Sequence, residues 1–516
     1  MSRSGYDVVI VGGGSAGSVL AARLSENRDL TVCLLEAGDY PTDPDIAVPQ
    51  KWPSLQGRSY DWDYATAPQP GTAGRVHAWP RGRIIGGSSC LHAMAHIRGH
   101  PEDFSSWAAA SGSRRWSYEG LLPGFIRSES FSGGASRVHG ADGPMPVYLP
   151  DDEINPVVRA YMEAGVSLGA PRLPDHNSGP LKGVAANSLT IRDGRRVSAA
   201  DAYLVPVLAR PNLTVITNAP VHRLAIFGQR VTGVVAEIAG QPRTISAART
   251  ILSAGAVASP LLLMRSGIGP ARNLQAAGVT CVADCPAVGA NLHDHLLIAG
   301  NLYAATRPVP PSRLQHSESL MYLDADDPGR RDGAPDIALA CVAAPTVSEC
   351  FEAPEYGTAY TILAGVSHPT SRGHLTISGP DLDHPPVIDP AYLSTEHDRR
   401  LSIRALELAR AVGHAAPLDD WRAAELLPGP ANADPAEIAE FIERASITHH
   451  HPVGTCSMGT GTEGVVDADL KLQGFAGAFV VDASVIPSIT SGPVNAAVLA
   501  IAETFAADLA SLWTSA

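Results

Sequence analysis

The chain has 516 residues, of which 45% are hydrophobic and 17% charged, a length and balance typical of two or three globular domains. Its formal net charge is −14, because 52 Asp and Glu outnumber 38 Lys and Arg, and this excess argues against a nucleic-acid or anionic-membrane partner. The seven cysteines are an odd number in a long chain and do not indicate a disulfide framework.

No secretory signal is visible at the N-terminus, and the apolar stretch at residues 496–513 is interrupted by Glu503 and Asp508. Cys281 and Cys285 are not followed by the second ligand pair that a zinc site requires, so no metal is expected. We therefore expect a cytoplasmic protein, a monomer or small homo-oligomer, that binds a small molecule and neither nucleic acid nor a membrane.

The N-terminal segment predicts the opening of a doubly wound α/β domain. Residues 8–11 are apolar and β-branched, and a glycine-rich turn follows them. Residues 18–24 are rich in Ala and Leu, as in a helix, and residues 31–35 resemble a second buried strand. This order of strand, glycine turn, helix and strand is typical of a dinucleotide-binding unit.

The turn Gly12–Gly17 fits the G-x-G-x-x-G pattern. In such a turn Gly12 makes the tight bend, Gly14 lets the backbone approach a pyrophosphate, and Gly17 lets the helix pack closely on the strand. The helix N-terminus then offers free N–H groups and a positive dipole end to the phosphates. Glu36 ends the second strand 19 residues after Gly17 and can accept hydrogen bonds from ribose hydroxyls. The turn alone leaves FAD and NAD as alternatives.

The rest of the chain alternates between regular and irregular segments. Residues 40–80 lack a regular hydrophobic periodicity and are expected to form a long ordered segment outside the regular elements. Residues 150–195 and 300–430 are proline-rich and irregular, and suit a separate substrate-facing domain. The further predicted elements are strands at residues 213–216, 231–238, 249–252 and 478–481 and a long helix at residues 495–512.

Four further sequence blocks carry a family resemblance. They are G-R-I-I-G-G-S-S-C-L-H at residues 82–92 with residues 97–104, the segment 255–269, V-G-A-N-L-H-D-H at 288–295, and H-P-V-G-T-C at 451–456. In this order they resemble the signatures of the glucose–methanol–choline (GMC) oxidoreductases. The resemblance extends from residue 6 to residue 505.

The resemblance implies a fold of two parts, in which a Rossmann-like FAD-binding domain joins a substrate-binding domain with an antiparallel sheet. The fold class is thus α/β combined with α+β. The FAD-binding domain is expected to comprise residues 1–150, 196–300 and 452–516, and the substrate-binding domain residues 151–195 and 301–451.

The resemblance also implies which residues hold FAD. Glu36 is expected at the adenosine ribose, Val221 at the adenine, and the second glycine turn at the flavin edge. Leu91 stands where some members carry the histidine that attaches FAD covalently, so the FAD is expected to be non-covalent. The implied cofactor-binding residues are Gly12, Gly14, Ser15, Ala16, Gly17, Glu36, Ala37, Arg83, Gly86, Gly87, Ser88, His92, Ala93, Val221, Ala254, Asp482, Ala483 and Asn495.

The densest histidine cluster, residues 449–451, is the candidate catalytic segment. In the family the histidine at the position of His451 takes the hydroxyl proton of the substrate, and imidazole titrates in the range that this task needs. If the segment is extended, His449 shares a face with His451. The usual histidine or asparagine partner is replaced by Pro493, which has no donor; this proline either forms part of the site with His449 or only begins the last helix.

The function implied is oxidation of a primary alcohol to an aldehyde, with hydride passing to flavin N5, His451 as the base, and O2 reduced to H2O2. The pair of His451 and Pro493 resembles that of members acting on pyridoxine, so an aromatic primary alcohol of this kind is the expected substrate. Two alternatives stay open: a choline-type or other alcohol dehydrogenase that reduces a quinone, and a redox-silent cyanohydrin lyase. The 288–295 block, which includes His293, Asp294 and His295, is expected to be structural.

Overall fold

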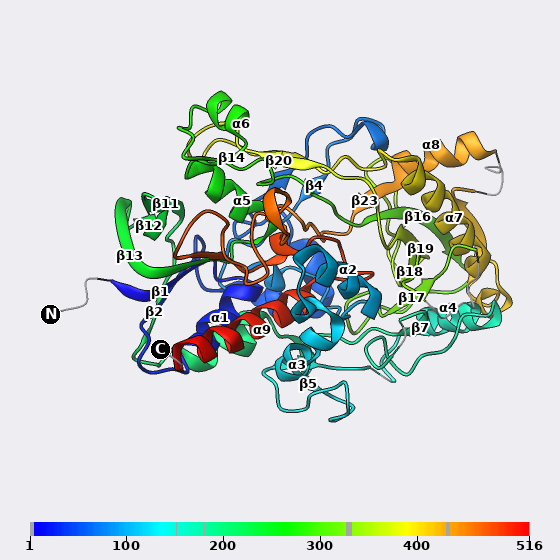
Figure 1. Ribbon diagram of the computed structural model, residues 1–516. Coiled ribbons are helices and arrows are strands. Elements are labelled where there is room, and N and C mark those ends of the chain that lie inside the picture. Colours follow the sequence, from blue (N-terminus) through cyan, green and yellow to red (C-terminus); the bar gives the residue numbers. More distant parts are fainter. Residues whose placement is uncertain (1–4, 151, 180, 327–332, 430–433, 515–516) are drawn as a thin grey trace.

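The structure is a computed structural model that describes residues 5–150, 152–179, 181–326, 333–429 and 434–514. Within these residues the chain folds around two seven-stranded sheets (Figure 1). Several strands of the first sheet run parallel, whereas every pairing in the second is antiparallel.

The first sheet combines a parallel half with an antiparallel extension. Its strands, in spatial order, are β10 (Leu213–Ile216), β2 (Val32–Leu35), β1 (Tyr6–Val11), β13 (Gln241–Leu252), β12 (Arg230–Ile238) and β11 (Val221–Phe227), with β24 (Ala478–Val480) also paired to β13. The end of β13 pairs in parallel with β1 and β24, and its beginning pairs antiparallel with β12. Residues 8–11 are buried throughout, as a central parallel strand covered on both faces requires.

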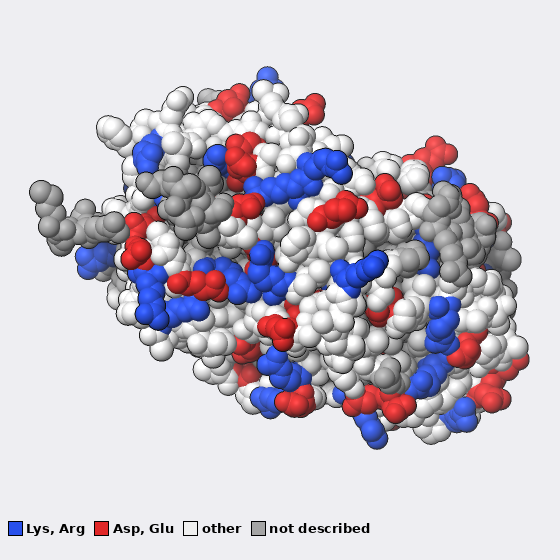
Figure 2. Space-filling model, turned by 60° about the horizontal axis from the view of Figure 1, so that its bottom comes forward, with Lys and Arg blue, Asp and Glu red and all other residues white. Residues whose placement is uncertain are grey.

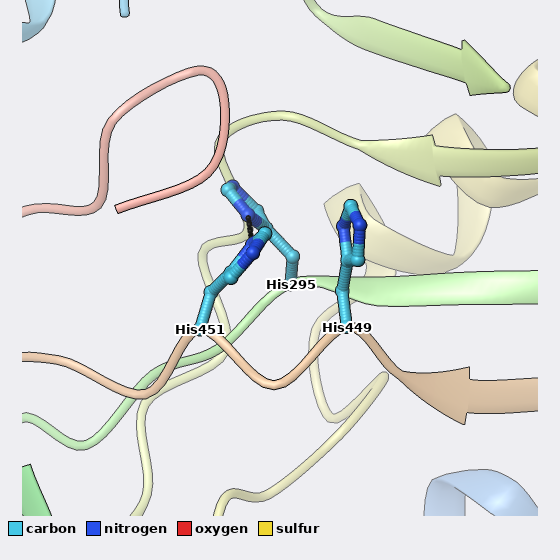
Figure 3. A group of neighbouring side chains, drawn as sticks. All are labelled: His295, His449 and His451. Carbon is cyan, nitrogen blue, oxygen red and sulfur yellow. Dashed lines mark hydrogen bonds between the residues drawn. The ribbon is translucent and has the colours of Figure 1, made fainter. Parts of the chain in front are cut away.

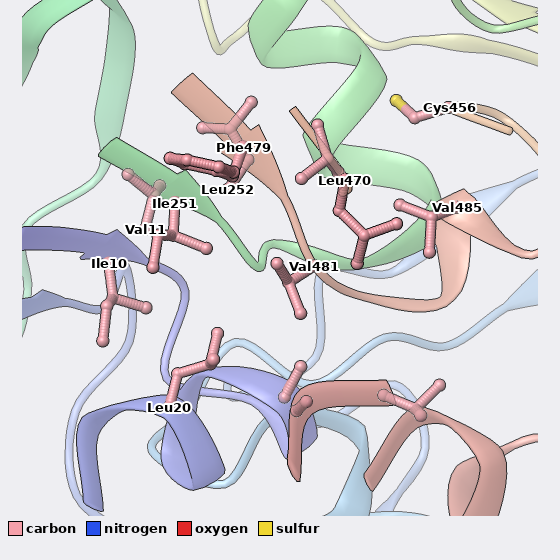
Figure 4. Close-up of a cluster of buried hydrophobic side chains, with 14 of the residues drawn as sticks. Ile10, Val11, Leu20, Ile251, Leu252, Cys456, Leu470, Phe479, Val481 and Val485 are labelled. Carbon is pink, nitrogen blue, oxygen red and sulfur yellow. The ribbon is translucent and has the colours of Figure 1, made fainter. Parts of the chain in front are cut away.

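Helices from distant parts of the chain cover this sheet. Helix α1 (Ser15–Leu24) packs on β1 and β2, α9 (Asn495–Thr514) packs on α1, and α3 (Tyr118–Ser128) packs on α9; Figure 1 shows the red α9 lying along the blue α1. Buried side chains of the sheet gather near Leu20 of α1 (Figure 4); among them are Ile10, Val11, Ile251, Leu252 and Phe479. A Cβ on Gly17 would lie 1.9 Å from Gly12 O, so only glycine lets α1 begin this close to the turn.

The second sheet separates a helix-covered face from an open one. Its strands, in spatial order, are β22 (Arg422–Leu427), β16 (Leu296–Ala305), β19 (Ala359–Val366), β18 (Ile337–Val342), β17 (Ser319–Leu323) and β7 (Gly183–Ala186), with β23 (Ser446–Thr448) paired to β16. Alternate residues such as Leu339 and Cys341 pack under the helices α4 (Pro156–Ser167), α7 (Glu396–Gly413) and α8 (Pro435–Ala445). Their neighbours Ala340 and Val342 form a separate apolar cluster on the other face.

Shorter elements complete the described fold. The remaining α-helices and strands are α2 (Pro101–Ser111), α5 (Gly255–Arg265), α6 (Ala271–Ala276), β3 (Tyr64–Ala65), β4 (Ala78–Trp79), β5 (Glu129–Phe131), β6 (Met145–Val147), β8 (Ile191–Arg192), β9 (Arg195–Arg196), β14 (Ile268–Gly269), β15 (Ala283–Asp284), β20 (His374–Thr376) and β21 (Val387–Asp389). None of the described helices is long and apolar enough to cross a membrane. On the face in Figure 2, acidic and basic side chains are interspersed.

The predicted fold class is confirmed, and the strand–turn–helix–strand opening lies where the sequence placed it. The description of residues 150–195 and 300–430 as irregular was wrong. These segments supply β7 and β17–β19 of the second sheet and the helices α4 and α7.

Candidate active site

A chamber of about 730 Å³ is lined by both sheets. On one side it is bounded by the ends of β1 and β2 at Val11 and Leu35. On the other side it is bounded by the open face of the second sheet, through Leu297, Leu320 and Leu363. Its volume lies at the upper end of the range for cofactor and ligand pockets.

Three helix N-termini face this chamber. The first residues of α1, α5 and α9 line it, at Ser15, Gly255 and Asn495. A helix start carries N–H groups without helical partners and a positive dipole end, which together favour an anionic ligand such as a diphosphate. At the start of α5, however, the Gly255 N–H already donates to Asp482 Oδ2 at 2.9 Å. The Ser15 hydroxyl donates to Asn495 Oδ1 at 2.7 Å and so joins the starts of α1 and α9.

The two glycine turns lie against each other at the edge of the chamber. A Cβ on Gly87 would come within 2.7 Å of Gly14 Cα, and Gly87 has a φ of 53°, in the left-handed region that favours glycine. A Cβ on Gly14 would meet only Gly87 Cα, at 3.8 Å. The turns therefore leave a backbone-walled space that an elongated ligand can enter.

Glu36 lies at the end of β2 and binds the turn. Its Oε2 accepts from Gly13 N–H at 2.7 Å and its Oε1 from Gly38 N–H at 2.9 Å. Burial raises the pKa of the Glu36 carboxyl to about 7, against the lowering effect of these backbone hydrogen bonds. Each oxygen keeps a further lone pair, so the side chain can also receive ribose hydroxyls.

Most of the predicted cofactor-binding residues line the chamber. Those that do are Gly12, Gly14, Ser15, Ala16, Glu36, Ala37, Gly87, Ser88, His92, Ala93, Val221, Ala254, Asp482, Ala483 and Asn495. Gly17 and Gly86 lie behind the lining and shape the two turns. Arg83 also lies outside it, because its guanidinium packs over the Trp62 ring and donates to Ser59 O.

His92 presents a fixed donor to the chamber. Its Nδ1 accepts from Met94 N–H at 3.1 Å and from Arg196 Nη1 at 3.0 Å, so the ring hydrogen must be on Nε2. Burial, together with the adjacent Arg196 charge, lowers the pKa of His92 to about 3. His92 thus presents a neutral imidazole with an Nε2–H donor to the chamber.

Three histidines meet at the other end of the chamber (Figure 3). The rings of His449 and His451 are 4.2 Å apart between centroids, and His451 Nδ1 lies 3.0 Å from His295 Nδ1. Both His449 and His451 line the chamber, as predicted for the catalytic pair. His295 was not predicted here, because the resemblance implied a structural role for its sequence block.

The candidate catalytic segment is kinked, so the condition of an extended segment is not met. Strand β23 ends at Thr448, and His450 has a left-handed φ of 63°. Arg81 Nη1 donates to His450 O at 3.1 Å and holds the kink. The two flanking rings still lie on one side of the segment, His449 before the kink and His451 after it (Figure 3).

Asp294 anchors the backbone of this segment. Its Oδ1 accepts from His451 N–H at 2.6 Å, and its Oδ2 accepts from the hydroxyls of Thr448 at 2.6 Å and Tyr392 at 2.5 Å. Burial raises the pKa of this carboxyl, and the hydrogen bonds partly offset that rise. No sequence signal marked Asp294 as part of the site, because its contacts join segments far apart in the chain.

The histidine cluster is electrically neutral. Burial lowers the pKa of His451 well below its usual range, and the nearby His449 and His295 rings lower it further. Burial also lowers the pKa of His295, to about 4. The ligand atoms of the three rings lie within 4.8 Å of one another, a group that could hold a metal ion, although the His295–His451 bond already uses one nitrogen of each ring.

Pro493 lies in the loop before α9 and lines the chamber. Together with His295 and His449 it also lines a smaller hollow beside the chamber. The preceding Ser491 donates to Asp103 through its N–H at 2.7 Å and its hydroxyl at 2.8 Å, which anchors this loop to α2. The ring of Pro493 therefore adds an apolar wall next to the histidines and no hydrogen-bond donor.

Comparisons with known proteins identify the family. Models of the N-terminal and C-terminal domains described as GMC oxidoreductase match residues 6–297 and 369–502. The chain is 54% identical over 503 residues to the pyridoxine 4-oxidase of Microbacterium luteolum, covering 97% of this chain and 98% of that protein. It is 35% identical to an oxygen-dependent choline dehydrogenase of Ectopseudomonas mendocina (strain ymp), with 97% and 93% coverage.

Solved structures agree with these matches. The crystal structure of pyridoxine 4-oxidase from Mesorbium loti superposes with a TM-score of 0.97 at 56% identity, covering 98% of this chain and 99% of that one. An Aspergillus oryzae formate oxidase, studied for its FAD modification, superposes with a TM-score of 0.90 at 25% identity, with full coverage of both chains.

The chain belongs to the GMC oxidoreductase family. Within that family it is an FAD-dependent alcohol oxidase. The residues present fit FAD, because the N-termini of α1 and α9 and two glycine turns offer donors and space for a diphosphate, and Glu36 offers acceptors for a ribose.

Proposed function

We propose that this chain oxidises pyridoxine at a primary alcohol to give pyridoxal, with O2 reduced to H2O2. The observation that carries this proposal is the neutral His451, held at the chamber wall next to His449 and Pro493. The high identity to a pyridoxine 4-oxidase over nearly the whole chain supports the substrate.

In the proposed mechanism the histidines act on the substrate hydroxyl. His451 is the base: its lowered pKa keeps it neutral at physiological pH, so a lone pair is available for the hydroxyl proton. His449, whose tilted ring lies 4.2 Å away between centroids, is close enough to hydrogen-bond the same oxygen. Pro493 excludes water from the adjoining wall. Bound FAD supplies the two-electron acceptor for the hydride of the carbinol carbon.

The substrate side of the chamber offers unpaired hydrogen-bond acceptors. Asn187 Nδ2 donates to Ser317 O at 2.9 Å, so its Oδ1 is fixed in orientation, and this buried atom has no partner. His316 Nε2 donates to Gln50 O at 2.8 Å, so its buried Nδ1 is an acceptor, and it too has no partner. Both residues line the chamber. Both atoms are shielded in this structure, so each meets a hydroxyl of a substrate such as pyridoxine only when the lining adjusts on binding.

The same lining argues against a choline-type substrate. Among the described residues that line the chamber, the carboxylates are Glu36 and Asp482. Asp482 already accepts from Gly255 N–H, Ser259 and Ser484, and Glu36 binds the glycine turn. Among these described lining residues, no carboxylate is thus free on the substrate side to pair with a quaternary ammonium group.

Two structural expectations belong to the same proposal. FAD is held non-covalently, because Leu91 offers no nucleophile for attachment. The FAD-binding domain comprises residues 1–150, 196–300 and 452–516, and the substrate-binding domain residues 151–195 and 301–451. Strand β16 (Leu296–Ala305) runs across the boundary at residue 300 and links the two.

The experiment is anaerobic flavin reduction with pyridoxine, benzyl alcohol, choline and glucose, followed by admission of air. Bleaching by pyridoxine with rapid return of the flavin spectrum and formation of peroxide is expected. Bleaching by choline but not pyridoxine would overturn the substrate. Slow return in air, with fast return on adding a quinone, would favour the dehydrogenase alternative. Bleaching by none of them, together with cleavage of a cyanohydrin, would favour the lyase alternative.

A further inference from the structure

His295 lies immediately before β16 and turns its ring toward His451 (Figure 3). Its Nδ1 is 3.0 Å from His451 Nδ1, and its Nε2 is 2.8 Å from the backbone oxygen of Ser367. The ring is buried, with 4% of its surface exposed. Each nitrogen of His295 therefore has a partner, the backbone of Thr490 also lies within reach of the ring, and His295 has no direct place on the substrate side of His451.

These two contacts determine where the hydrogens lie. A carbonyl oxygen only accepts, so His295 must carry its hydrogen on Nε2 to bind Ser367 O. The ring is neutral at physiological pH, because burial lowers its pKa to about 4. Its Nδ1 is then an acceptor, and the hydrogen between the two rings must come from His451 Nδ1. Neutral His451 thus has its lone pair on Nε2.

We propose that His295 is a positioning residue that keeps His451 in the tautomer with Nδ1–H and a free Nε2 lone pair. This inference rests on the proposed role of His451 as the base. When Nε2 takes the substrate proton, the Nδ1–H bond to His295 remains in place and the charged ring does not turn. Because His295 Nε2 ends on a carbonyl, the proton has no onward acceptor there, so His295 orients the base and does not relay the proton.

The backbone and the ring of His451 are thus held separately. Asp294 accepts from His451 N–H, which fixes the backbone, and the adjacent residue His295 fixes the ring. Both come from the segment that leads into β16, and β16 pairs with β23 through Leu296 and Thr448. The geometry of the base is therefore set by one strand pairing.

The test compares His295→Leu with His295→Asn. Asparagine can place an oxygen near the position of the imidazole Nδ1 and keep an acceptor for His451, whereas leucine offers none. We expect His295→Leu to lower the rate of anaerobic flavin reduction by about 10- to 100-fold, the loss typical when the outer partner that orients a metal-ligating histidine is removed. The dissociation constant of pyridoxine and the FAD content stay near the wild-type values, and His295→Asn recovers most of the rate.

The outcomes separate this inference from the proposed function. His451→Ala is measured alongside: if it reduces its flavin at the wild-type rate, the proposed base is wrong. If His451→Ala is slow but His295→Leu is as fast as the wild type, or if the asparagine and leucine variants are equally slow, only the positioning role is wrong.

If His295→Leu does not retain FAD, the tautomer of His451 is measured in the wild-type enzyme instead. Nitrogen NMR of the protein labelled with 15N-histidine distinguishes the two neutral tautomers, and the His451 signal is assigned by its loss in His451→Ala. A His451 with its hydrogen on Nδ1 supports the inference, and one with its hydrogen on Nε2 overturns it.

Discussion

Replacing Gly14 with alanine should separate cofactor binding from folding. A Cβ at this position would meet only Gly87 Cα at 3.8 Å, an ordinary van der Waals contact, and the backbone of Gly14 has a φ of −75° that alanine adopts freely. At position 17 the same methyl group would lie 1.9 Å from Gly12 O. The change at 14 therefore adds bulk only to the chamber, and the change at 17 disturbs the packing of α1.

The expected loss of FAD affinity follows from the N–H donors that the added methyl group would shield from the ligand. The N–H groups at the start of α1 face the chamber and suit a diphosphate. A hydrogen bond to a charged group contributes about 1.5–3 kcal/mol. Loss of one such bond therefore weakens FAD binding by about 10- to 150-fold, at about 1.4 kcal/mol per factor of ten.

The assay is titration of the apoprotein with FAD, followed by flavin fluorescence, with thermal unfolding of each apoprotein measured alongside. Gly179→Ala is the matched control, because Gly179 is exposed and a Cβ there meets nothing within 4 Å. The Gly14→Ala apoprotein should unfold at the same temperature as the control yet bind FAD more weakly. The Gly17→Ala apoprotein should unfold at a lower temperature. Two results would refute the reasoning: Gly14→Ala binds FAD with wild-type affinity, or it binds FAD more weakly only because the apoprotein is unfolded.

Four shorter predictions concern the site and its surroundings. His451→Ala should keep FAD but slow anaerobic flavin reduction by about 10²- to 10⁴-fold, the usual contribution of a general base; stopped-flow absorbance measures this. Asn187→Leu should raise the KM for pyridoxine by about 2- to 12-fold, through one lost neutral hydrogen bond, and leave that for benzyl alcohol unchanged. Acid precipitation should release all flavin to the supernatant, since Leu91 cannot hold it; yellow protein in the pellet would contradict this. Burial lowers the pKa of His293 to about 3, so as the pH falls below about 6.5 the unfolded chain takes up a proton at this residue before the folded chain does. The free energy of unfolding, measured in denaturant, should therefore fall by about 2 kcal/mol from this residue between pH 6.5 and 5.

The dinucleotide half of the site could be predicted from sequence because local rules define it. The turn Gly12–Gly17 lies between a buried strand and a helix, and Glu36 ends the next strand, so each position follows from its neighbours in the chain. The structure brings Gly14 and Glu36 to the same chamber as expected. Arg83 was placed there by resemblance alone and lies outside the lining, packed against Trp62.

The resemblance predicted an antiparallel sheet, but its strands could not be located in the sequence, for a physical reason. Strands β17 and β19 are buried along their whole length, because one face packs under helices and the other faces an enclosed chamber. Both faces are therefore apolar, and the alternation of polar and apolar residues that marks a half-exposed strand does not appear. Asn187 and His316, at the ends of such strands, carry no local signal either.

In the chamber, the residues that orient the base and the residues proposed to recognise the substrate lie at the ends of different strands. The base His451 is held by Asp294 and His295, which belong to the segment entering β16. The unpaired acceptors of Asn187 and His316 lie instead at the adjoining ends of β7 and β17, where Asn187 N–H donates to Glu318 O. Because neither acceptor contributes to the contacts that orient the base, substitutions at the β7–β17 end can change which alcohol is recognised while the proton-accepting geometry stays intact.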